Sequence, residues 1–256
     1  MDENDKPIIV LTAGGTGGHI YPAAALALVL EDRGFRPVLI TDRRGSRYDG
    51  FLNHIKIFKI RACGIAGKGF FGKIQSLCEL AVGIFQARIL LTKLNPSLVI
   101  GFGGYASAPT MIAACYGKFK TLIHEQNFIL GRANRFLSAR VNLIATSFEL
   151  AEGELFRNQK VRYTGMPVRP IVEMKSNQQY SIFGVDPILK ILVIGGSQGA
   201  SVFSKIIPEA LKKLDYGIRS RIQITQQCRF EDLNFVRVQY SSLGVKADLS
   251  IFFEDI

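Results

Sequence analysis

The chain has 256 residues, 48% of them apolar, and a formal net charge of +11. This length can bury one large core or two domain-sized cores, and no uninterrupted apolar run approaches the roughly 18 residues that span a bilayer. The start of the chain is acidic where a signal peptide would be basic, and the four cysteines form no C-x-x-C pair. We therefore expect a cytosolic protein without a disulfide framework or a structural zinc site.

Apolar strand patterns alternate with helical patterns from residue 7 to about residue 163. We expect helices near 19–33, 72–94, 105–117 and 130–138, and strands near 7–12, 36–41, 55–60, 97–101, 120–124, 141–145 and 161–163. Such alternation is typical of a parallel sheet covered by helices. The first part of the chain, residues 1–163, is therefore expected to be an α/β domain.

The first predicted strand runs into a glycine-rich turn, Gly14 to Gly18, and then into a helix opened by His19. The backbone N–H groups of such a turn approach an anion closely, and the positive end of the helix favours phosphate. The register of these glycines differs from the G-x-G-x-x-G of dinucleotide-binding folds. Because a helix N-terminus disfavours the imidazolium form, His19 is expected to be neutral and able to act as a general base. The alternative is a histidine without a chemical role at the start of a helix.

Basic residues concentrate between Arg43 and Lys73. Within this region, residues 64–74 place two adjacent phenylalanines between lysines and lead into a helix with apolar residues at helical spacing. Docking on an anionic membrane surface would use both features. The alternative is that the apolar helix face is core and the lysines are only solvated. Nucleic acid is disfavoured, because no stacking aromatics are interleaved with the wider basic set.

Two further segments follow predicted strands. The segment Gly101 to Pro109 contains glycines and small residues that permit close approach of another backbone or a ligand, beside the first turn if the two strands are neighbours. His124, Glu125, Gln126 and Asn127 lie at the end of another strand, where open α/β sheets bind ligands. Zinc is a weak alternative there, because no second histidine lies at ligand spacing.

The alternating pattern lapses between residues 164 and 189 and then begins again. We interpret 164–189 as a connector and 190–256 as a second domain, with strands near 190–194, 219–225 and 247–253, a helix near 200–213 and a helical or irregular stretch near 229–242. A doubly wound domain normally needs about 100 residues or more, so this second domain is expected to be incomplete. Arg169 in the connector and Ser197 in a second glycine turn suit a diphosphate group.

Six segments, in this order, closely resemble the MurG family of glycosyltransferases, and the resemblance covers essentially the whole chain. They are Gly14 to His19, Gly64 to Ile74, Gly101 to Pro109, His124 to Asn127, Gly165 to Arg169 and Gly195 to Ala200. The family implies a GT-B architecture, in which two Rossmann-like domains face each other, the first on the acceptor side and the second on the donor side. It implies an inverting, metal-independent transfer of N-acetylglucosamine, without a cofactor, from UDP-N-acetylglucosamine to lipid I (undecaprenyl-pyrophosphoryl-MurNAc-pentapeptide). The product is lipid II for peptidoglycan, made at the cytoplasmic face of the inner membrane.

The resemblance also implies roles for single residues. His19 is similar to the base that acts on the acceptor hydroxyl, and residues 64–74 are similar to the surface that meets the membrane. The implied substrate contacts are Thr16, Gly17, Gly18, Asn127, Arg169, Ser197 and Phe253, the last at a position that contacts uracil. Met166 departs from the pattern, because the family usually has asparagine there, and any hydrogen bond from that asparagine is lost.

The chain stops soon after Phe253, before the segments with which the family holds the nucleotide ribose and the donor sugar. We therefore expect this chain alone to bind the donor weakly and to have little activity. Two alternatives stay open: a membrane-docked, acceptor-binding module without catalysis, and a subunit of a split enzyme. A dinucleotide-dependent oxidoreductase is disfavoured by the glycine register and because Asp42 is the only candidate for a ribose-binding acid.

Overall fold

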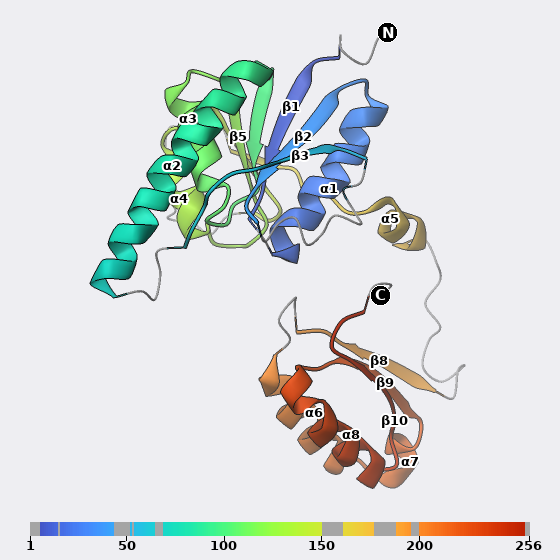
Figure 1. Cartoon of the computed structure of the whole chain (residues 1–256). Coiled ribbons are helices and arrows are strands. Elements are labelled where there is room, and N and C mark those ends of the chain that lie inside the picture. Colours follow the sequence, from blue (N-terminus) through green and yellow to red (C-terminus); the bar gives the residue numbers. More distant parts are fainter. Residues whose placement is uncertain are drawn as a thin grey trace. The chain divides into compact units, whose positions relative to one another are not determined.

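The structure is a computed structural model that describes residues 6–14, 16–43, 52, 54–64, 69–149, 161–176, 188–195 and 200–253. The chain divides into two compact units, which we call unit 1 (Met1–Ser176) and unit 2 (Asn177–Ile256). Each unit has its own parallel sheet and its own hydrophobic core (Figure 1).

Unit 1 contains a seven-stranded sheet with the order β3-β2-β1-β4-β5-β6-β7, and every neighbouring pair is parallel. The strands are β1 Ile8–Thr12, β2 Arg36–Thr41, β3 Lys56–Lys59, β4 Leu98–Gly101, β5 Thr121–Glu125, β6 Leu143–Thr146 and β7 Val161–Tyr163. The helices are α1 Gly17–Asp32, α2 Phe70–Leu94, α3 Ala108–Tyr116, α4 Arg132–Ser138 and α5 Pro170–Ser176. Strand β1 lies between β2 and β4, so the chain builds the sheet outward from β1 in one direction and then in the other.

Both faces of this sheet are buried, because successive side chains of a strand point to opposite faces. From β1, Val10 enters a core cluster with Leu91 of α2 and Met111 of α3, whereas Leu11 enters a second cluster with Ile20 of α1. Figure 1 shows α1 on one side of the sheet and α2 and α3 on the other. Burial on both faces explains why these strands are apolar almost throughout and do not alternate with polar residues.

Helix α2 differs from the other helices in its length of 25 residues and in its exposure. Within Phe71–Leu94, an 18-residue stretch has a mean hydropathy of 1.4, and 22% of that stretch is buried. By length and composition alone, this helix could cross a membrane. A search for an unbroken apolar run passes over this helix because Glu79 and Arg88 interrupt the run. The helix contributes Leu91 to the core, whereas Phe85 on another side is 67% exposed.

The predicted elements are present with shifted ends, and the structure adds two short helices that the sequence pattern did not predict. Helix α5 lies in the expected connector and begins at Pro170, whose fixed φ suits the first turn of a helix. The helix predicted over 105–117 begins only at Ala108, because Gly103 and Gly104 have φ values of +88° and +77° and form a turn before it. The second addition, α7 Tyr216–Arg219, lies in unit 2.

Unit 2 contains a three-stranded parallel sheet with the order β10-β9-β8. Its other elements are β8 Leu189–Val193, α6 Ser201–Lys212, β9 Ile222–Gln227, the 3-10 helix η3 Phe230–Asp232, α8 Leu233–Ser242 and β10 Lys246–Ser250. One core cluster, which includes Ile224, Val236 and Tyr240, joins the sheet to α6 and α8. The Tyr240 hydroxyl donates a hydrogen bond to the buried side chain of Gln226. Among the described residues, β8 pairs with β9 and has no strand on its other side.

Candidate active site at the carboxyl edge of the first sheet

The predicted site residues of unit 1 gather at the carboxyl ends of β1, β4 and β5. Strands β1 and β4 are neighbours, which is the condition for their loops to meet, and the loops that follow them touch. The Gly14 N–H donates to the Gly103 carbonyl at 3.0 Å, and a Cβ on Gly104 would lie 2.9 Å from the Gly14 Cα. The sheet reverses its building direction between β1 and β4, and open α/β sheets bind ligands at that point.

His19 lies in the first turn of α1, half-buried, with its ring against the two glycines that follow β4. A Cβ on Gly103 would lie 3.4 Å from the His19 Cε1, and a Cβ on Gly104 would lie 3.1 Å from its Cδ2. Any side chain at these positions would therefore press on the ring. The glycines predicted to permit close approach do so for the Gly14 backbone and for the His19 ring, and we call them the glycine cradle.

The glycine turn before α1 leaves room for a ligand at the helix start. Helix α1 follows Thr16 without a side-chain cap, and the N–H groups of Gly17 and Gly18 come too early in the helix to bond to a carbonyl within it. Gly18 is exposed, and a Cβ built on it would meet nothing within 4 Å, whereas one on Gly17 would lie 2.9 Å from the Tyr21 ring. An anion can therefore approach the helix at Gly18.

A chain of hydrogen bonds connects His19 to β5 and to the segment that follows β7. The Nδ1 of His19 lies 3.1 Å from the Oε1 of Gln126, and the Nε2 of Gln126 lies 3.1 Å from the Nδ1 of His124. The Nε2 of His124 lies 3.0 Å from the carbonyl oxygen of Gly165. Burial lowers the pKa of His124 below its ordinary value of 6.5, against the smaller opposing effects of the Gly165 carbonyl and the Glu125 charge. Sequence reasoning placed these residues at a ligand crevice but did not identify their connection to His19.

Asn127, a predicted donor-sugar contact, is held by the buried carboxylate of Glu125. Glu125 is 1% exposed, and its Oε1 accepts from the backbone N–H of Asn127 at 3.0 Å and from its Nδ2 at 2.9 Å. Its Oε2 accepts from the Gly131 N–H and from the Nδ2 of Asn134, both at 2.9 Å. Sequence reasoning missed Asn134, and an asparagine on the buried side of the short helix α4 is the signal that could have indicated it.

Arg169 lies beside α1, with its guanidinium 5.1 Å from the centroid of the Tyr21 ring. The Tyr21 ring also lies beside Gly17, where a Cβ would be 2.9 Å from it, so Arg169 lies near the first turn of α1. Asp42, the only candidate in the sequence for a ribose-binding acid, is 4% exposed and accepts a hydrogen bond from the Tyr105 hydroxyl at 2.9 Å. That bond connects the loops after β2 and β4.

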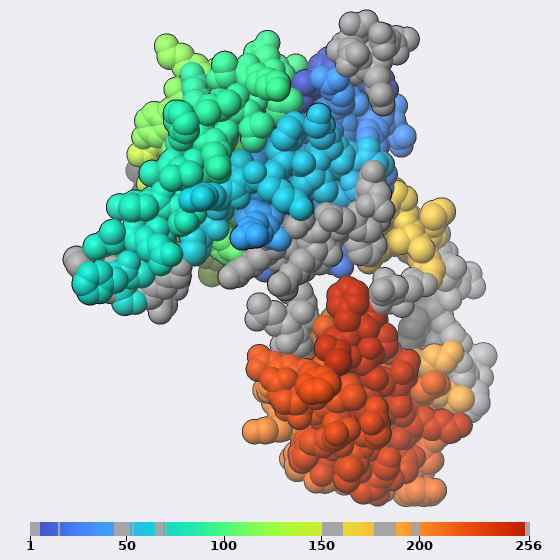
Figure 2. All heavy atoms as spheres, viewed as in Figure 1, coloured from blue at the N-terminus to red at the C-terminus, as the bar shows by residue number. Residues whose placement is uncertain are grey.

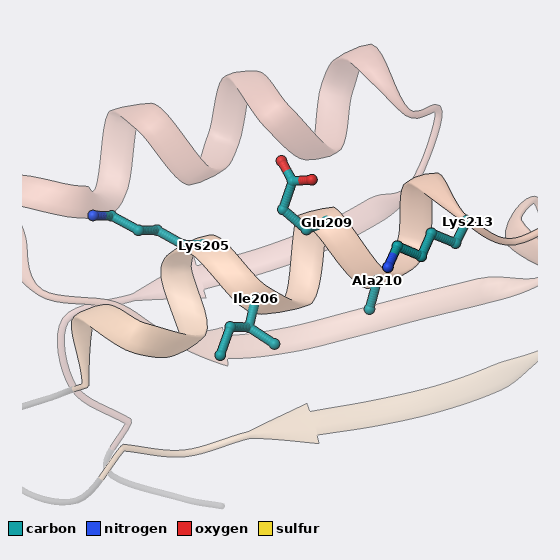
Figure 3. Close-up of a pocket in the computed structure, with 5 residues that line it drawn as sticks. All are labelled: Lys205, Ile206, Glu209, Ala210 and Lys213. Atoms are coloured by element: carbon teal, nitrogen blue, oxygen red, sulfur yellow. The ribbon is translucent and has the colours of Figure 1, made fainter.

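The predicted site residues of unit 2 are less completely described. Phe253 is half-buried and follows the carboxyl end of β10, whereas Ser197 lies outside the described residues. A hollow of about 350 Å³ in unit 2 is lined by Lys205, Ile206, Glu209 and Ala210 of α6 and by Lys213, the residue that follows this helix (Figure 3). Phe253 is not among the residues that line it. In the described part of the chain, no group of three or more His, Cys, Asp or Glu side chains is arranged to hold a metal ion.

Both halves of the chain match known domains. Residues 9–146 match the glycosyltransferase family 28 N-terminal domain, and residues 190–256 match the glycosyltransferase family 28 C-terminal domain.

Several curated relatives have the name UDP-N-acetylglucosamine--N-acetylmuramyl-(pentapeptide) pyrophosphoryl-undecaprenol N-acetylglucosamine transferase. The protein of that name from Paramagnetospirillum magneticum is 49% identical over 252 residues, which is 98% of this chain and 68% of that protein. The one from Rhodospirillum rubrum is 47% identical over 248 residues, which is 97% of this chain and 64% of that protein. The chain thus spans about two thirds of the length of the curated relatives that it matches.

Solved structures agree on the fold. The crystal structure of MurG from Acinetobacter baumannii is similar with a TM-score of 0.68 and 26% identity, over 97% of this chain and 69% of that one. UDP-GlcNAc 2-epimerase from Neisseria meningitidis, solved with UDP-GlcNAc bound, has a TM-score of 0.63 at 17% identity, over 96% of this chain and 73% of its own, and shows the fold alone. The α/β fold of GT-B type expected from the sequence is confirmed.

Proposed function

The chain belongs to glycosyltransferase family 28, and we propose that it serves the transfer of N-acetylglucosamine from UDP-N-acetylglucosamine to lipid I, forming lipid II. The observation that carries this proposal is the position of His19, in a glycine cradle at the carboxyl edge of the sheet and next to an open helix start. A base and an approach for an anion within one helical turn suit a hydroxyl that attacks a sugar activated by a diphosphate.

The proposed step is a single displacement with inversion. The acceptor hydroxyl oxygen forms a bond to C1 of N-acetylglucosamine, and the bond between C1 and the diphosphate oxygen breaks. UDP leaves with that electron pair, and the hydroxyl proton passes to the Nε2 of His19. The step requires no metal ion, and the imidazolium then loses its proton to solvent.

The remaining contacts are proposed from the resemblance. The N–H groups of Gly17 and Gly18 and the Thr16 residue would meet the diphosphate or sugar, and Asn127 would contact the donor sugar. Arg169 and Ser197 would meet the nucleotide diphosphate, and Phe253 the uracil. The open space at Gly18 and the fixed side chain of Asn127 support these roles. Residues 1–163 would be the acceptor side, 164–189 the connector and 190–256 the donor side.

Membrane docking is proposed through the exposed side of α2 and residues 64–74, of which 65–68 lie outside the described residues. Phe71 is 85% exposed, and Ile74, Leu77 and Phe85 are also exposed on this helix. Figure 1 shows the first turns of α2 projecting beyond the carboxyl edge of the unit 1 sheet, and Figure 2 shows the same part of the chain protruding from unit 1. His19 lies at that edge, in the first turn of α1. The exposed Lys73 adds attraction to anionic lipid, which supports a peripheral position on the cytoplasmic face of the inner membrane.

Vesicle sedimentation tests the docking. Phe85→Ser should reduce binding to vesicles that contain phosphatidylglycerol several-fold, because the exposed ring inserts among the acyl chains. Phe235→Ser, on the exposed side of α8 in unit 2, serves as the matched control and should leave binding unchanged. Equal binding by the two variants would remove α2 from the docking surface.

A turnover assay with lipid I and labelled UDP-N-acetylglucosamine tests the transferase. Any lipid II formed should fall by about 100-fold or more in His19→Ala, since general-base catalysis typically contributes that much. His54→Ala is the matched control, because His54 lies near Glu31 at 3.7 Å and outside the glycine cradle. We expect calorimetry to show weak donor binding by this chain, and tight binding would contradict that expectation.

A second candidate is an acceptor-binding module or a subunit of a split enzyme. The observation that favours it is the unit 2 sheet, in which β8 has a strand on one side only among the described residues. If the chain binds vesicles that contain lipid I without turnover, and His19→Ala leaves that binding unchanged, this candidate is selected over the transferase.

A further inference from the structure

We propose that Gln126 and His124 are positioning residues that fix the tautomer of His19, so that Nδ1 carries the hydrogen and Nε2 carries the lone pair. The inference rests on the proposed function only for the role of His19 as the base. The hydrogen-bond chain itself stands on contacts within unit 1.

The first fixed end of the chain is the carbonyl of Gly165. A carbonyl oxygen only accepts hydrogen bonds, so the Nε2 of His124, at 3.0 Å, must carry a hydrogen. His124 is 4% exposed, and burial, which lowers its pKa, keeps it neutral. A neutral ring with hydrogen on Nε2 has its lone pair on Nδ1, so His124 Nδ1 is an acceptor.

The next group whose orientation is fixed is the side-chain amide of Gln126, which lies between His124 and His19. Its Nε2 lies 3.1 Å from the His124 Nδ1 and also donates to the His124 backbone carbonyl at 3.1 Å. Both partners are acceptors, so the nitrogen of the amide must face them and the oxygen must face the other way. The Oε1 then meets the Nδ1 of His19 at 3.1 Å, and His19 has to donate from that nitrogen.

The surroundings hold this arrangement in place. The backbone carbonyl of His124 also accepts from the Nδ2 of the buried Asn134 at 3.1 Å, and the glycine cradle restrains the ring of His19. The neighbouring carboxylate of Glu125 is directed to Asn127, Gly131 and Asn134. The neutral amide of Gln126 therefore orients His19. The carboxylate of Glu125 instead accepts hydrogen bonds from the loop after β5 and from α4.

The chain of hydrogen bonds from Gly165 to His19 orients the His19 ring and carries no proton. When Nε2 of His19 takes the hydroxyl proton, Nδ1 keeps its hydrogen and still donates to Gln126, so no other member of the chain has to change its protonation. The Nε2 of His19 therefore points away from Gln126 in every turnover. Because folding already selects the tautomer, no free energy is needed to select it during the reaction.

The test measures the ring nitrogens directly, by NMR of the intact chain labelled with ¹⁵N-histidine. In the wild type at pH 8, His19 should show hydrogen on Nδ1 and a lone pair on Nε2, and His124 should show the opposite tautomer. Gln126→Leu should shift His19 toward the Nε2–H form. Gln126→Glu, which can accept from Nδ1 but cannot donate to His124, should keep the His19 tautomer. Gln223→Leu, at an exposed glutamine of β9, is the matched control.

Hydrogen on Nε2 of His19 in the wild type, or an unchanged tautomer in Gln126→Leu, would overturn the proposal. With turnover measurable, Gln126→Leu should lower kcat at least tenfold with KM changed less than twofold, and Gln126→Glu should restore part of it. Because the tautomer is read without substrate, it can be confirmed even if His19→Ala retains turnover. Retained turnover in His19→Ala would reject His19 as the base, and the proposal that Gln126 and His124 fix its tautomer would still stand.

Discussion

In both units an apolar strand, β1 or β8, is followed in the sequence by a glycine-rich segment and then by a helix, but among the described residues only β1 has a strand on each side. Strand β1 has β2 on one side and β4 on the other, whereas β8 has only β9 among the described residues. The partners of His19 come from the β4 side, namely the glycine cradle after β4 and Gln126 after β5. The strand and helix of this motif therefore provide only an approach for an anion, whereas the segments after β4 and β5 hold the ring of His19.

The two sheets also differ in how they are covered. Leu39 of β2 in unit 1 is fully buried in a cluster with α1, and the opposite face of its sheet has a second cluster. In unit 2, Leu192 of β8 is 50% exposed, and the described core lies between the sheet and α6 and α8. Apolar burial is the main favourable term in folding, so we expect unit 1 to be the more stable unit.

Core truncation should give the largest difference between the units. Leu39→Ala should destabilise unit 1 by about 3 kcal/mol, because it removes buried methyl groups and leaves a cavity. Leu192→Ala, the matched change in a strand of unit 2, should cost under about 1 kcal/mol, because half of that side chain is already in water. Hydrogen exchange read by mass spectrometry on peptides from each unit measures both. Similar losses in both variants would show that β8 is covered as fully as β2.

Substitution of two glycines, one in each unit, can distinguish the cost of backbone strain from the cost of close packing. Gly104 of unit 1 and Gly244 of unit 2 both have positive φ, at +77° and +67°, which a side chain disfavours. A Cβ on Gly244 would meet nothing within 4 Å, whereas one on Gly104 would press on the Gly14 Cα and on the His19 ring.

Gly244→Ala should therefore cost about 1 kcal/mol from strain alone, and Gly104→Ala should cost about 2 to 3 kcal/mol. The NMR signals of the His19 ring should shift only in Gly104→Ala. Equal costs, with an unchanged His19 spectrum, would mean that the cradle does not hold the ring.

Much of this arrangement was readable from the sequence, and the part that was not has a physical reason. Apolar runs that end at glycine turns predicted β1 and β4, and the apolar run that ends at His124 predicted β5. Parallel pairing then placed His19 and Asn127 at one edge. The bond from His19 to Gln126 joins residues 107 positions apart and depends on side-chain rotamers, which no local pattern encodes. The short helix α5 was missed, because tertiary context decides whether so few residues form a helix.

The smallest expected effect is a pH dependence confined to unit 1. Burial lowers the pKa of His124, whereas in the unfolded chain this ring takes its proton near its ordinary value of 6.5. Below 6.5 and down to the folded-state value, the unfolded state binds more protons, so the stability of unit 1 should fall as the pH falls. The slope for one group is at most about 1.4 kcal/mol per pH unit.

Residues 177–256 contain no histidine, so unit 2 provides an internal control in the same window. Unfolding of the two units should be followed by hydrogen exchange between pH 7 and pH 5, corrected for intrinsic exchange rates. His124→Phe, which keeps a ring against Phe102, should remove most of the slope in unit 1. A slope that persists in that variant would assign the acid sensitivity to another group. A slope of equal size in unit 2, which has no histidine, would show that the acid sensitivity does not come from the buried ring of His124.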